Sequence, residues 1–321
     1  MCYICNNKTI GTLMRQTEER YISLLTDFGF KRIFGTVINK DLLICFLNSL
    51  FAGKQVVKGV KYLNSENVGD VFTDRKAIFD VYCEGENGER FIVEMQNAYQ
   101  AYFKDRSLFY STFPIREQAP KGKDWDFKLS HIYTIALLNF NMHEAAFDQE
   151  KLSHHVQLCD TATHKVFYDK LEFIYVEIAK FDKSLDELET LYDKWLFALK
   201  NLYKLDERPK ALRDRVFDRL FEEAEIAKLT PLELREYEAS QFAYRDIKNS
   251  IDTAKREGRA EGRAEGRAEG RAEGRAEGRA EGINLEKIAT ARRMLSDGMA
   301  LEQVMKYTGL SKEQIDSTPN A

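Results

Sequence analysis

Two acidic side chains interrupt two neighbouring apolar segments of the chain. Asp80 lies within residues 76–83, KAIFDVYC, and Glu94 lies within residues 90–96, RFIVEMQ. Side chains alternate along a strand, so Gln96 shares a face with Glu94. Two carboxylates directly opposite each other in a sheet repel. A shared divalent cation would reverse that penalty, and hard oxygen ligands with open water positions suit Mg²⁺ or Mn²⁺.

The turn between the two segments decides whether the acids meet. Asn87-Gly88 between β-rich segments is a strong signal for a β-hairpin. A two-residue loop at this dipeptide would place Asp80 opposite Met95, with the acids on inconsistent faces. A three-residue loop, with Gly88 in the left-handed conformation, would place Asp80 directly opposite Glu94. We expect the two carboxylates on adjacent antiparallel strands, close enough to share one ion.

The same residues allow a second interpretation, in which Asp80 and Glu94 are solvated acids on the exposed face of a hairpin. Acidic residues are common in hairpins, so the pair alone does not decide between a metal site and a solvated surface. Gln96 favours the metal site slightly, because its amide adds a further polar group on the same face.

The elements that must position these acids indicate an α/β fold. Residues at helical spacing predict helices near Thr17, from a cap at Asp27 to Gly35, over 40–51, 99–117 and 186–202, and between 209 and 249. Apolar and β-branched runs predict strands over 76–83, 90–96, 131–140 and 171–181. This order fits a mixed sheet flanked by helices and disfavours an all-helical structural protein.

Composition limits the class of protein. The chain has 321 residues, of which 44% are hydrophobic, enough to fill a sizeable core. The formal net charge of −4 argues against a protein that coats nucleic acid passively, because such proteins need a basic surface. The charge is compatible with an enzyme that grips phosphates locally and brings in a metal cation.

The cysteines and the apolar segments indicate a cytoplasmic protein. Five cysteines are scattered without a disulfide pattern, as is typical of reduced thiols. Cys2 and Cys5 form one C-x-x-C, but no second pair completes a zinc site. No apolar run reaches the roughly 18 residues of a membrane span, and the N-terminus lacks a secretory signal. We therefore expect a soluble protein with no membrane partner.

The chain divides into four parts by composition. Residues 1–16 form a leader, 17–249 the sheet-containing domain with its C-terminal helices, 250–283 a spacer, and 284–321 a small helical tail. Six RAEG units fill 259–282, and each glycine weakens a helix by about 1 kcal/mol relative to alanine. Low complexity favours a solvated, semi-rigid spacer. The alternative is a helix that pairs only within an oligomer.

The tail combines a helix, a TGLS turn and a further helix. Gly298 is expected to end the first helix, and Ser311 is expected to cap the last one. This order is compatible with a helix-turn-helix. A small helical cap or docking unit is the alternative, because the last helix has few basic residues.

The ordered series of these segments resembles the Rpn-type recombination-promoting nucleases and transposases, which belong to the PD-(D/E)XK nuclease superfamily. The core of the resemblance is Asp80, followed by Glu94-Met95-Gln96 at the end of the next strand. The resemblance covers roughly residues 17–315 through further shared features, namely Asp27-Phe28-Gly29-Phe30-Lys31, Arg106, Tyr110, Asn139-Phe140, Glu177-Ile178-Ala179-Lys180-Phe181, Trp195, the RAEG units and the TGLS turn.

The resemblance implies a restriction-endonuclease-like fold with a metal-dependent site. Asp80 and Glu94 match the metal-binding acids, and Gln96 stands where the superfamily usually has lysine. A glutamine orients water or a phosphate oxygen by hydrogen bonds, but it supplies no positive charge. Lys76, on the face of Asp80, or Lys31 would then supply that charge. The implied catalytic residues are Asp80, Glu94, Gln96 and Lys76, with the accessory residues Asp27, Lys31, Arg106 and Tyr110.

Two functional hypotheses follow. In the first, the protein is a Mg²⁺-dependent DNA endonuclease, able to form a homo-oligomer, that promotes recombination or transposition. In the second, it is a nuclease-derived fold that cleaves weakly or not at all and binds DNA or a partner protein. Gln96 keeps the second hypothesis open, because it removes the usual charge of the superfamily.

Overall fold

The chain forms two compact units, Met1–Ser250 and Ile251–Ala321. The predicted leader, residues 1–16, lies outside the part that the structure describes. This computed structural model describes residues 19–63, 66–67, 77–119 and 125–316.

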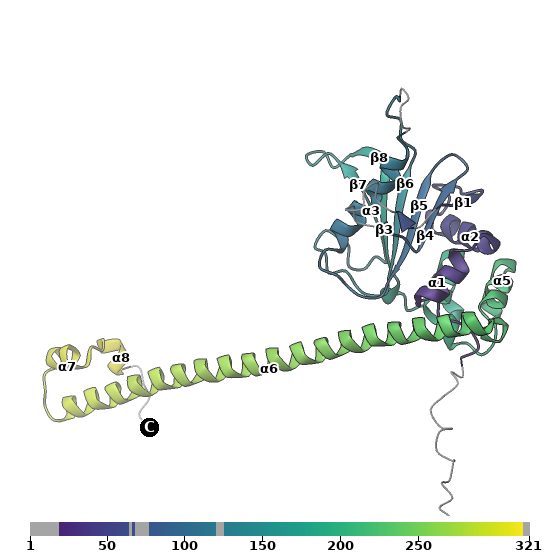
Figure 1. The fold of residues 1–321 in the computed structure, drawn as a ribbon. Helices are drawn as coiled ribbons and strands as arrows, with labels where there is room; N and C mark the ends of the chain where they lie inside the picture. Colours follow the sequence, from purple (N-terminus) through teal and green to yellow (C-terminus); the bar gives the residue numbers. More distant parts are fainter. Residues whose placement is uncertain (1–18, 64–65, 68–76, 120–124, 317–321) are drawn as a thin grey trace, which may run out of the picture. The chain divides into compact units, whose positions relative to one another are not determined.

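A six-stranded mixed sheet forms the centre of the first unit (Figure 1). Its strands stand in the order β1-β4-β5-β6-β8-β7. β6 is parallel to both β5 and β8, and the other neighbours pair antiparallel. β2 and β3 form a separate two-stranded sheet. The strands are β1 Val60–Tyr62, β2 Glu66–Asn67, β3 Ala77–Ile78, β4 Val81–Gly85, β5 Arg90–Gln96, β6 Ile132–Leu138, β7 Ser153–Cys159 and β8 Val166–Glu177.

Helices cover both faces of the sheet, which confirms the predicted fold class (Figure 1). On one face lies α3 (Phe103–Glu117). The main hydrophobic core joins the other face to α1 (Asp27–Phe34), α2 (Lys40–Phe51), α4 (Leu191–Asn201) and α5 (Arg215–Glu223). Short 3-10 helices are η1 Val37–Asn39, η2 Ile178–Lys180, η3 Leu185–Glu187, η4 Leu202–Lys204, η5 Lys210–Leu212 and η6 Ile226–Lys228.

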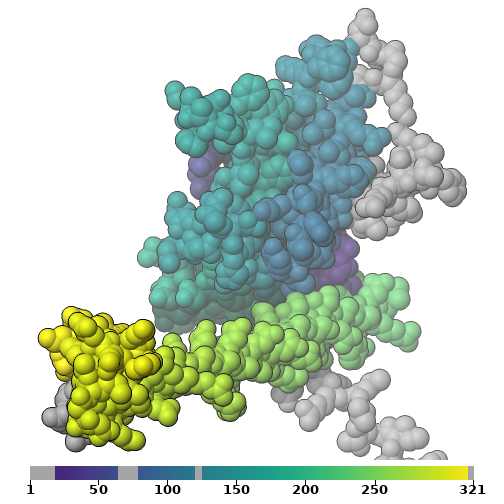
Figure 2. Space-filling view, turned by 90° about the vertical axis from the view of Figure 1, so that its left-hand side faces the viewer, coloured from purple at the N-terminus to yellow at the C-terminus, as the bar shows by residue number. Residues whose placement is uncertain are grey.

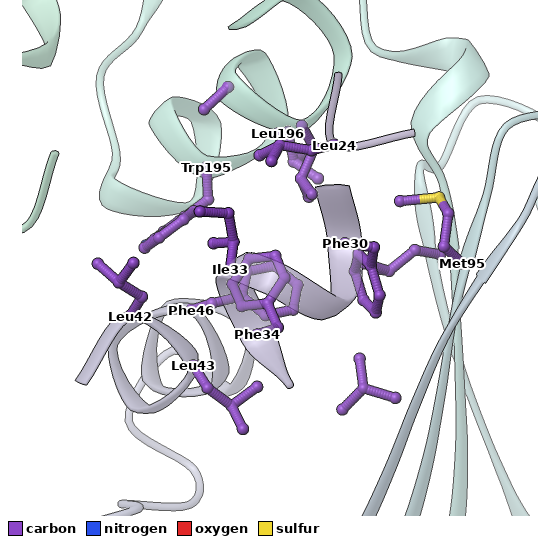
Figure 3. Close-up of a cluster of buried hydrophobic side chains, with 14 of the residues drawn as sticks. Leu24, Phe30, Ile33, Phe34, Leu42, Leu43, Phe46, Met95, Trp195 and Leu196 are labelled. Atoms are coloured by element: carbon purple, nitrogen blue, oxygen red, sulfur yellow. The ribbon is translucent and has the colours of Figure 1, made fainter. Parts of the chain in front are cut away.

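Trp195 lies in that core, where helices from distant parts of the chain meet (Figure 3). The indole is fully buried, and its ring centroid lies 5.6 Å from that of Phe34, 5.9 Å from Phe46 and 5.1 Å from Phe217. Aromatic pairs at such separations add about 0.5–1.5 kcal/mol each beyond the area that they bury. This packing ties α1, which carries Lys31, to the other helices on its face of the sheet.

The helix predicted at the start of the first unit is wrong in its described part. Residues 19–26 are not helical. Tyr21 pairs instead with Glu225 in an isolated β-bridge, and the amide of Ile22 donates to the carbonyl oxygen of Ala224 at 2.9 Å. The apolar spacing in this segment therefore reflects burial against a distant part of the chain, because tertiary pairing overrides local propensity.

The first described helix, α1, begins one residue earlier than predicted. Thr26 is its N-cap, because Thr26 Oγ1 accepts a hydrogen bond from the amide of Gly29 at 3.1 Å. Asp27, the predicted cap, is instead the first residue of the helix. Gly35 ends α1 as predicted, and α2 has the predicted bounds 40–51.

The strands agree with the predictions only in part. β5 has the predicted bounds 90–96, but the predicted strand 76–83 is interrupted at Phe79 and Asp80. β8 begins earlier than predicted, because its N-terminal part pairs with β7. β7 was not predicted, since most of its side chains are polar, and it lies at the edge of the sheet.

The second unit is helical. It contains the end of α6 (Pro231–Ser296), α7 (Leu301–Thr308) and α8 (Lys312–Asp316). Ser311 caps α8 as predicted, because its Oγ accepts from the amide of Gln314 at 3.3 Å. Five buried residues form the core of this unit, namely Ile288, Ala291, Val304, Leu310 and Ile315.

The RAEG units lie within α6, and their side chains are exposed. Figure 2 shows them in yellow-green on the surface of the helix. A Cβ built on any glycine of the units would have no heavy atom within 4 Å. Helix propensity and solvation alone therefore act on this segment, and no packed core depends on it.

Deleting three RAEG units, residues 259–270, is expected to leave the thermal midpoint of the first unit nearly unchanged. The deleted side chains are exposed, and none of them belongs to that unit's hydrophobic core. Trp195→Ala is the matched positive control, because emptying a fully buried indole site costs about 3–5 kcal/mol. Calorimetry of the full chain measures both variants. A large drop for the deletion would show that the segment supports the fold.

Among the described residues, no single helix is long and apolar enough to cross a membrane. α1 and the segment Val37–Phe51 meet the length and composition requirement only together, as a pair bent by 62°.

Candidate active site

The hairpin of β4 and β5 has the predicted three-residue loop. Val81 pairs with Val93, and the amide of Gly85 donates to the carbonyl oxygen of Glu89 at 2.8 Å, so residues 86–88 form the loop. Gly88 has a φ of 82°, the left-handed conformation that this turn needs. The register is therefore confirmed, and its continuation by one residue brings Asp80 opposite Glu94.

Asp80 itself lies at a bend immediately before β4. Phe79 and Tyr82 both join the cluster that contains Ile92, so the strict alternation predicted for 76–83 fails at the bend. The bend frees the carboxylate from the ladder, and Oδ2 of Asp80 accepts a hydrogen bond from the amide of Met95 at 2.9 Å. Asp80 is thereby fixed beside the residue that follows Glu94. Lys76 lies outside the described residues.

Glu94 is buried, with 7% of its surface exposed. Its Oε2 accepts from Nε2 of Gln96 at 3.1 Å, and its Oε1 has no hydrogen-bond partner among the described residues. Burial, followed by the charge of Asp80, raises the pKa of Glu94 to about 8. Burial also raises the pKa of Asp80, against the opposing effects of the Met95 amide and Lys31. Burial is thus the main cause of both pKa shifts, and it outweighs the effect of the nearby cations.

One cation approaches this pair from α1. Nζ of Lys31 lies 2.7 Å from Oδ1 of Asp27 and 3.7 Å from Oδ1 of Asp80. Lys31 and Asp27 are one helical turn apart, so α1 presents both groups on one face. Lys31 therefore contributes positive potential to Asp80 while it is itself paired with Asp27.

A second cation approaches from α3, on the other face of the sheet. Nη2 of Arg106 donates to Oε1 of Gln96, and Nη1 donates to Oε1 of Gln100 at 2.6 Å. The guanidinium lies over the rings of Phe103 and Tyr110, at 5.3 and 5.8 Å from their centroids. Burial, and then the charge of nearby Glu94, raises the pKa of Tyr110.

The contact between Arg106 and Gln96 was not predicted from residue spacing. Only the family resemblance indicated Arg106 as a site residue. One local signal was present, because Arg106 and Tyr110 are separated by four residues and share a helical face with the buried residues Phe103 and Ser107. The partner of Arg106 is Gln96 on β5. The two residues meet because α3 forms the connection between the parallel strands β5 and β6, and residue spacing does not reveal that arrangement.

The donor set fits a magnesium or manganese ion. No group of three or more His, Cys, Asp and Glu side chains gathers in the described ranges. Mg²⁺ does not need such a group, because it keeps several waters and is held by one or two carboxylates. Asp80 and Glu94 provide two carboxylates, and the buried Oε1 of Glu94, which has no partner in the described part of the chain, is an oxygen that a cation would satisfy.

Without metal, ionisation of Glu94 is expected to make the folded protein less stable as pH rises. The folded state binds a proton at Glu94 up to about pH 8, whereas the unfolded state loses it near 4.5. The free energy of unfolding should therefore fall as the pH rises from 4.5 to about 8. Glu94→Gln mimics the protonated acid and should remove that fall, which is on the order of a few kcal/mol.

Urea denaturation of both proteins in EDTA at pH 5, 6.5 and 8 measures this difference. The wild type should lose stability relative to Glu94→Gln over the series. Parallel stability curves would show that Glu94 is ionised in the folded protein and that its carboxylate is solvated.

Comparison with known families agrees with the architecture. Residues 24–254 match the family model of the PD-(D/E)XK nuclease family transposase. Residues 284–318 match the C-terminal HTH domain of the Rpn/YhgA-like nuclease family. No curated protein and no solved structure gives a significant match. The mixed sheet with its flanking helices is the PD-(D/E)XK fold, and the chain belongs to the PD-(D/E)XK nuclease family transposases, with the C-terminal HTH domain of the Rpn/YhgA-like nucleases.

Proposed function

We propose that the protein is a Mg²⁺-dependent DNA endonuclease that hydrolyses phosphodiester bonds in recombination or transposition in the cytoplasm. One observation carries the proposal: a buried glutamate, one oxygen of which has no partner among the residues that the structure describes, lies beside a second carboxylate in a nuclease fold. Two acids placed in this way are unfavourable in the metal-free protein, so a structural role does not explain them. A bound divalent cation does.

In the proposed site, two residues of the hairpin bind the metal and their neighbours orient them. Asp80 and Glu94 would hold Mg²⁺ or Mn²⁺. A cation held by these two residues would lower the pKa of a bound water molecule and would offset charge on the scissile phosphate. The amide of Met95 fixes the carboxylate of Asp80, and Nε2 of Gln96 fixes that of Glu94. Each acid is therefore oriented by a neighbour on β5 before any ligand binds.

The HTH match of the tail supports DNA as the partner. α7 and α8 are joined by the TGLS turn, as a helix-turn-helix requires. The chain has a net charge of −4, so binding is expected to depend on local cations, such as Lys31 and Arg106, rather than on a general basic surface. A homo-oligomer would bring two such sites to one DNA molecule.

A second function remains in view because Gln96 replaces the usual lysine. In that case the protein binds DNA or a partner protein but cleaves weakly or not at all. A supercoiled plasmid separates the two functions. Incubation with the full chain and Mg²⁺ should yield nicked or linear DNA, and EDTA should prevent it. Intact plasmid in both Mg²⁺ and Mn²⁺, together with retarded migration of a DNA duplex, would establish the binding function instead.

A further inference from the structure

Gln96 occupies an unusual position, because it contacts an acid and a cation at once. Its Nε2 donates to Oε2 of Glu94 at 3.1 Å, and its Oε1 accepts from Nη2 of Arg106. A lysine at this position has no acceptor, and its charge would repel the guanidinium. The glutamine therefore permits a cation from α3 to lie beside the acidic pair.

The two cations near the acids differ in how they are neutralised. Lys31 is paired with Asp27 at 2.7 Å. Arg106 forms no ion pair within 4.0 Å in the described part of the chain, and two neutral amides, of Gln96 and Gln100, hold it instead. Among the described residues, no carboxylate compensates the charge of Arg106 at contact distance, although Glu94 lies near enough for that charge to lower its pKa. Such a charge is suited to an anionic ligand.

The surroundings of Arg106 keep its guanidinium in place. The rings of Phe103 and Tyr110 lie under it, and Tyr110 packs in turn against Phe79 with a centroid separation of 5.3 Å. The side chain of Arg106 is partly exposed, so part of it borders solvent. A planar guanidinium with N–H donors left over matches two phosphate oxygens.

From this arrangement we infer that Arg106 is a catalytic residue that contacts the scissile phosphate and supplies the positive charge missing at position 96, and that Gln96 is its positioning residue. The inference rests on the proposed nuclease function. An arginine on α3 then supplies the positive charge that a lysine on the strand supplies elsewhere in the superfamily. An amide at position 96 is therefore compatible with cleavage. In the cleavage step, Lys31 then acts on Asp80 and not on the scissile phosphate.

The first test removes the charge. Arg106→Gln should slow plasmid cleavage in Mg²⁺ by about 100-fold, the usual effect of losing one donor to a developing charge. The matched control, Arg116→Gln, removes the same charge from the last turn of α3 and should cleave at the wild-type rate. The rise in thermal midpoint on adding Mg²⁺ should be the same in all three proteins, because Asp80 and Glu94 are intact.

The second test moves the charge back to the strand. The double variant Arg106→Gln with Gln96→Lys should cleave at least about 10-fold faster than Arg106→Gln alone, because a lysine at position 96 again places a cation beside the phosphate. Gln96→Leu should slow the wild type, but it should slow Arg106→Gln little further, because the two residues act as one unit.

A metal-free measurement separates this inference from the nuclease function itself. In EDTA, the affinity for a short DNA duplex should fall less steeply with salt in Arg106→Gln, by about one unit of slope, and not in Arg116→Gln. Wild-type protein that fails to cleave would refute the proposed function, while the salt slopes still report the phosphate contact. The inference would be overturned if Arg106→Gln cleaved at the wild-type rate or lost its thermal stabilisation by Mg²⁺. It would also be overturned if the salt dependence of its DNA affinity were unchanged, or if the double variant cleaved no faster than Arg106→Gln.

Discussion

Asp80→Asn is expected to reduce Mg²⁺-dependent cleavage by about 1000-fold or more while the protein stays folded. The metal's charge stabilisation is worth several kcal/mol, and each 1.4 kcal/mol is about tenfold in rate. The asparagine oxygen can still accept from the amide of Met95, so the local structure is retained. The metal-free variant should be as stable as the wild type or slightly more so, because a neutral amide replaces a partly buried carboxylate.

Plasmid cleavage and thermal unfolding with and without Mg²⁺ measure both parts of this result. Stabilisation by Mg²⁺ should shrink in the variant, because a ligand that binds only the folded state stabilises it by mass action. Asp182→Asn, on an exposed loop, is the control and should behave as wild type. Wild-type cleavage by Asp80→Asn would place the active site elsewhere. Unfolding of the metal-free variant would make Asp80 a structural residue.

Gly29→Ala is expected to destabilise the first unit by about 1–3 kcal/mol or more, although glycine to alanine normally stabilises a helix by about 1 kcal/mol. A Cβ on Gly29 would overlap the carbonyl oxygen of Ser23 and would lie 2.9 Å from Oγ1 of Thr26. The carbonyl oxygen of Ser23 belongs to the backbone, so it cannot move aside without displacing the chain. The displacement of α1 would also move Lys31 away from Asp80.

The repeat offers a matched control with the opposite sign. Gly266→Ala lies in the same kind of element, but nothing lies within 4 Å of its added Cβ. This change should raise the helical circular dichroism signal and leave the unfolding midpoint of the first unit unaltered. Urea denaturation compares the two variants. A Gly29→Ala protein as stable as the wild type would show that α1 does not approach the Ser23 carbonyl this closely.

The hairpin could be predicted because its turn chemistry is local. Asn87-Gly88 fixes the loop, the loop fixes the register, and the register brings Asp80 opposite Glu94. Helix α2 could be predicted for the same reason, since its apolar spacing and its end lie within a few turns of chain. Both cases depend on residues close together in sequence.

The features that were missed depend on distant contacts. The segment around Tyr21 has helical spacing, but its backbone bonds to residues near Glu225. β7 is mostly polar because it lies at an edge, so no apolar alternation marks it. The bend at Asp80 is set by the burial of Phe79 beside Tyr110, and the Gln96–Arg106 contact by a helix that crosses between two parallel strands.

In the RAEG segment, local helix propensity predicted less helical structure than the chain forms. Its glycines and its like charges four residues apart weaken a helix, yet the segment is helical within α6. Helical neighbours on both sides extend through it, because helix propagation requires less free energy than nucleation. Local composition therefore described its solvation but underestimated its helical order.

An anomalous difference map of crystals grown with Mn²⁺ would show whether Asp80 and Glu94 together bind a divalent cation. We predict one peak at about 2.1 Å from a carboxylate oxygen of each residue, with Oε1 of Glu94, which has no hydrogen-bond partner within the described ranges, among the ligands. The peak should vanish in Asp80→Asn. Asp80 and Glu94 do not form a shared metal site if well-ordered crystals in Mn²⁺ show no peak between these two carboxylates, or show the peak at other residues.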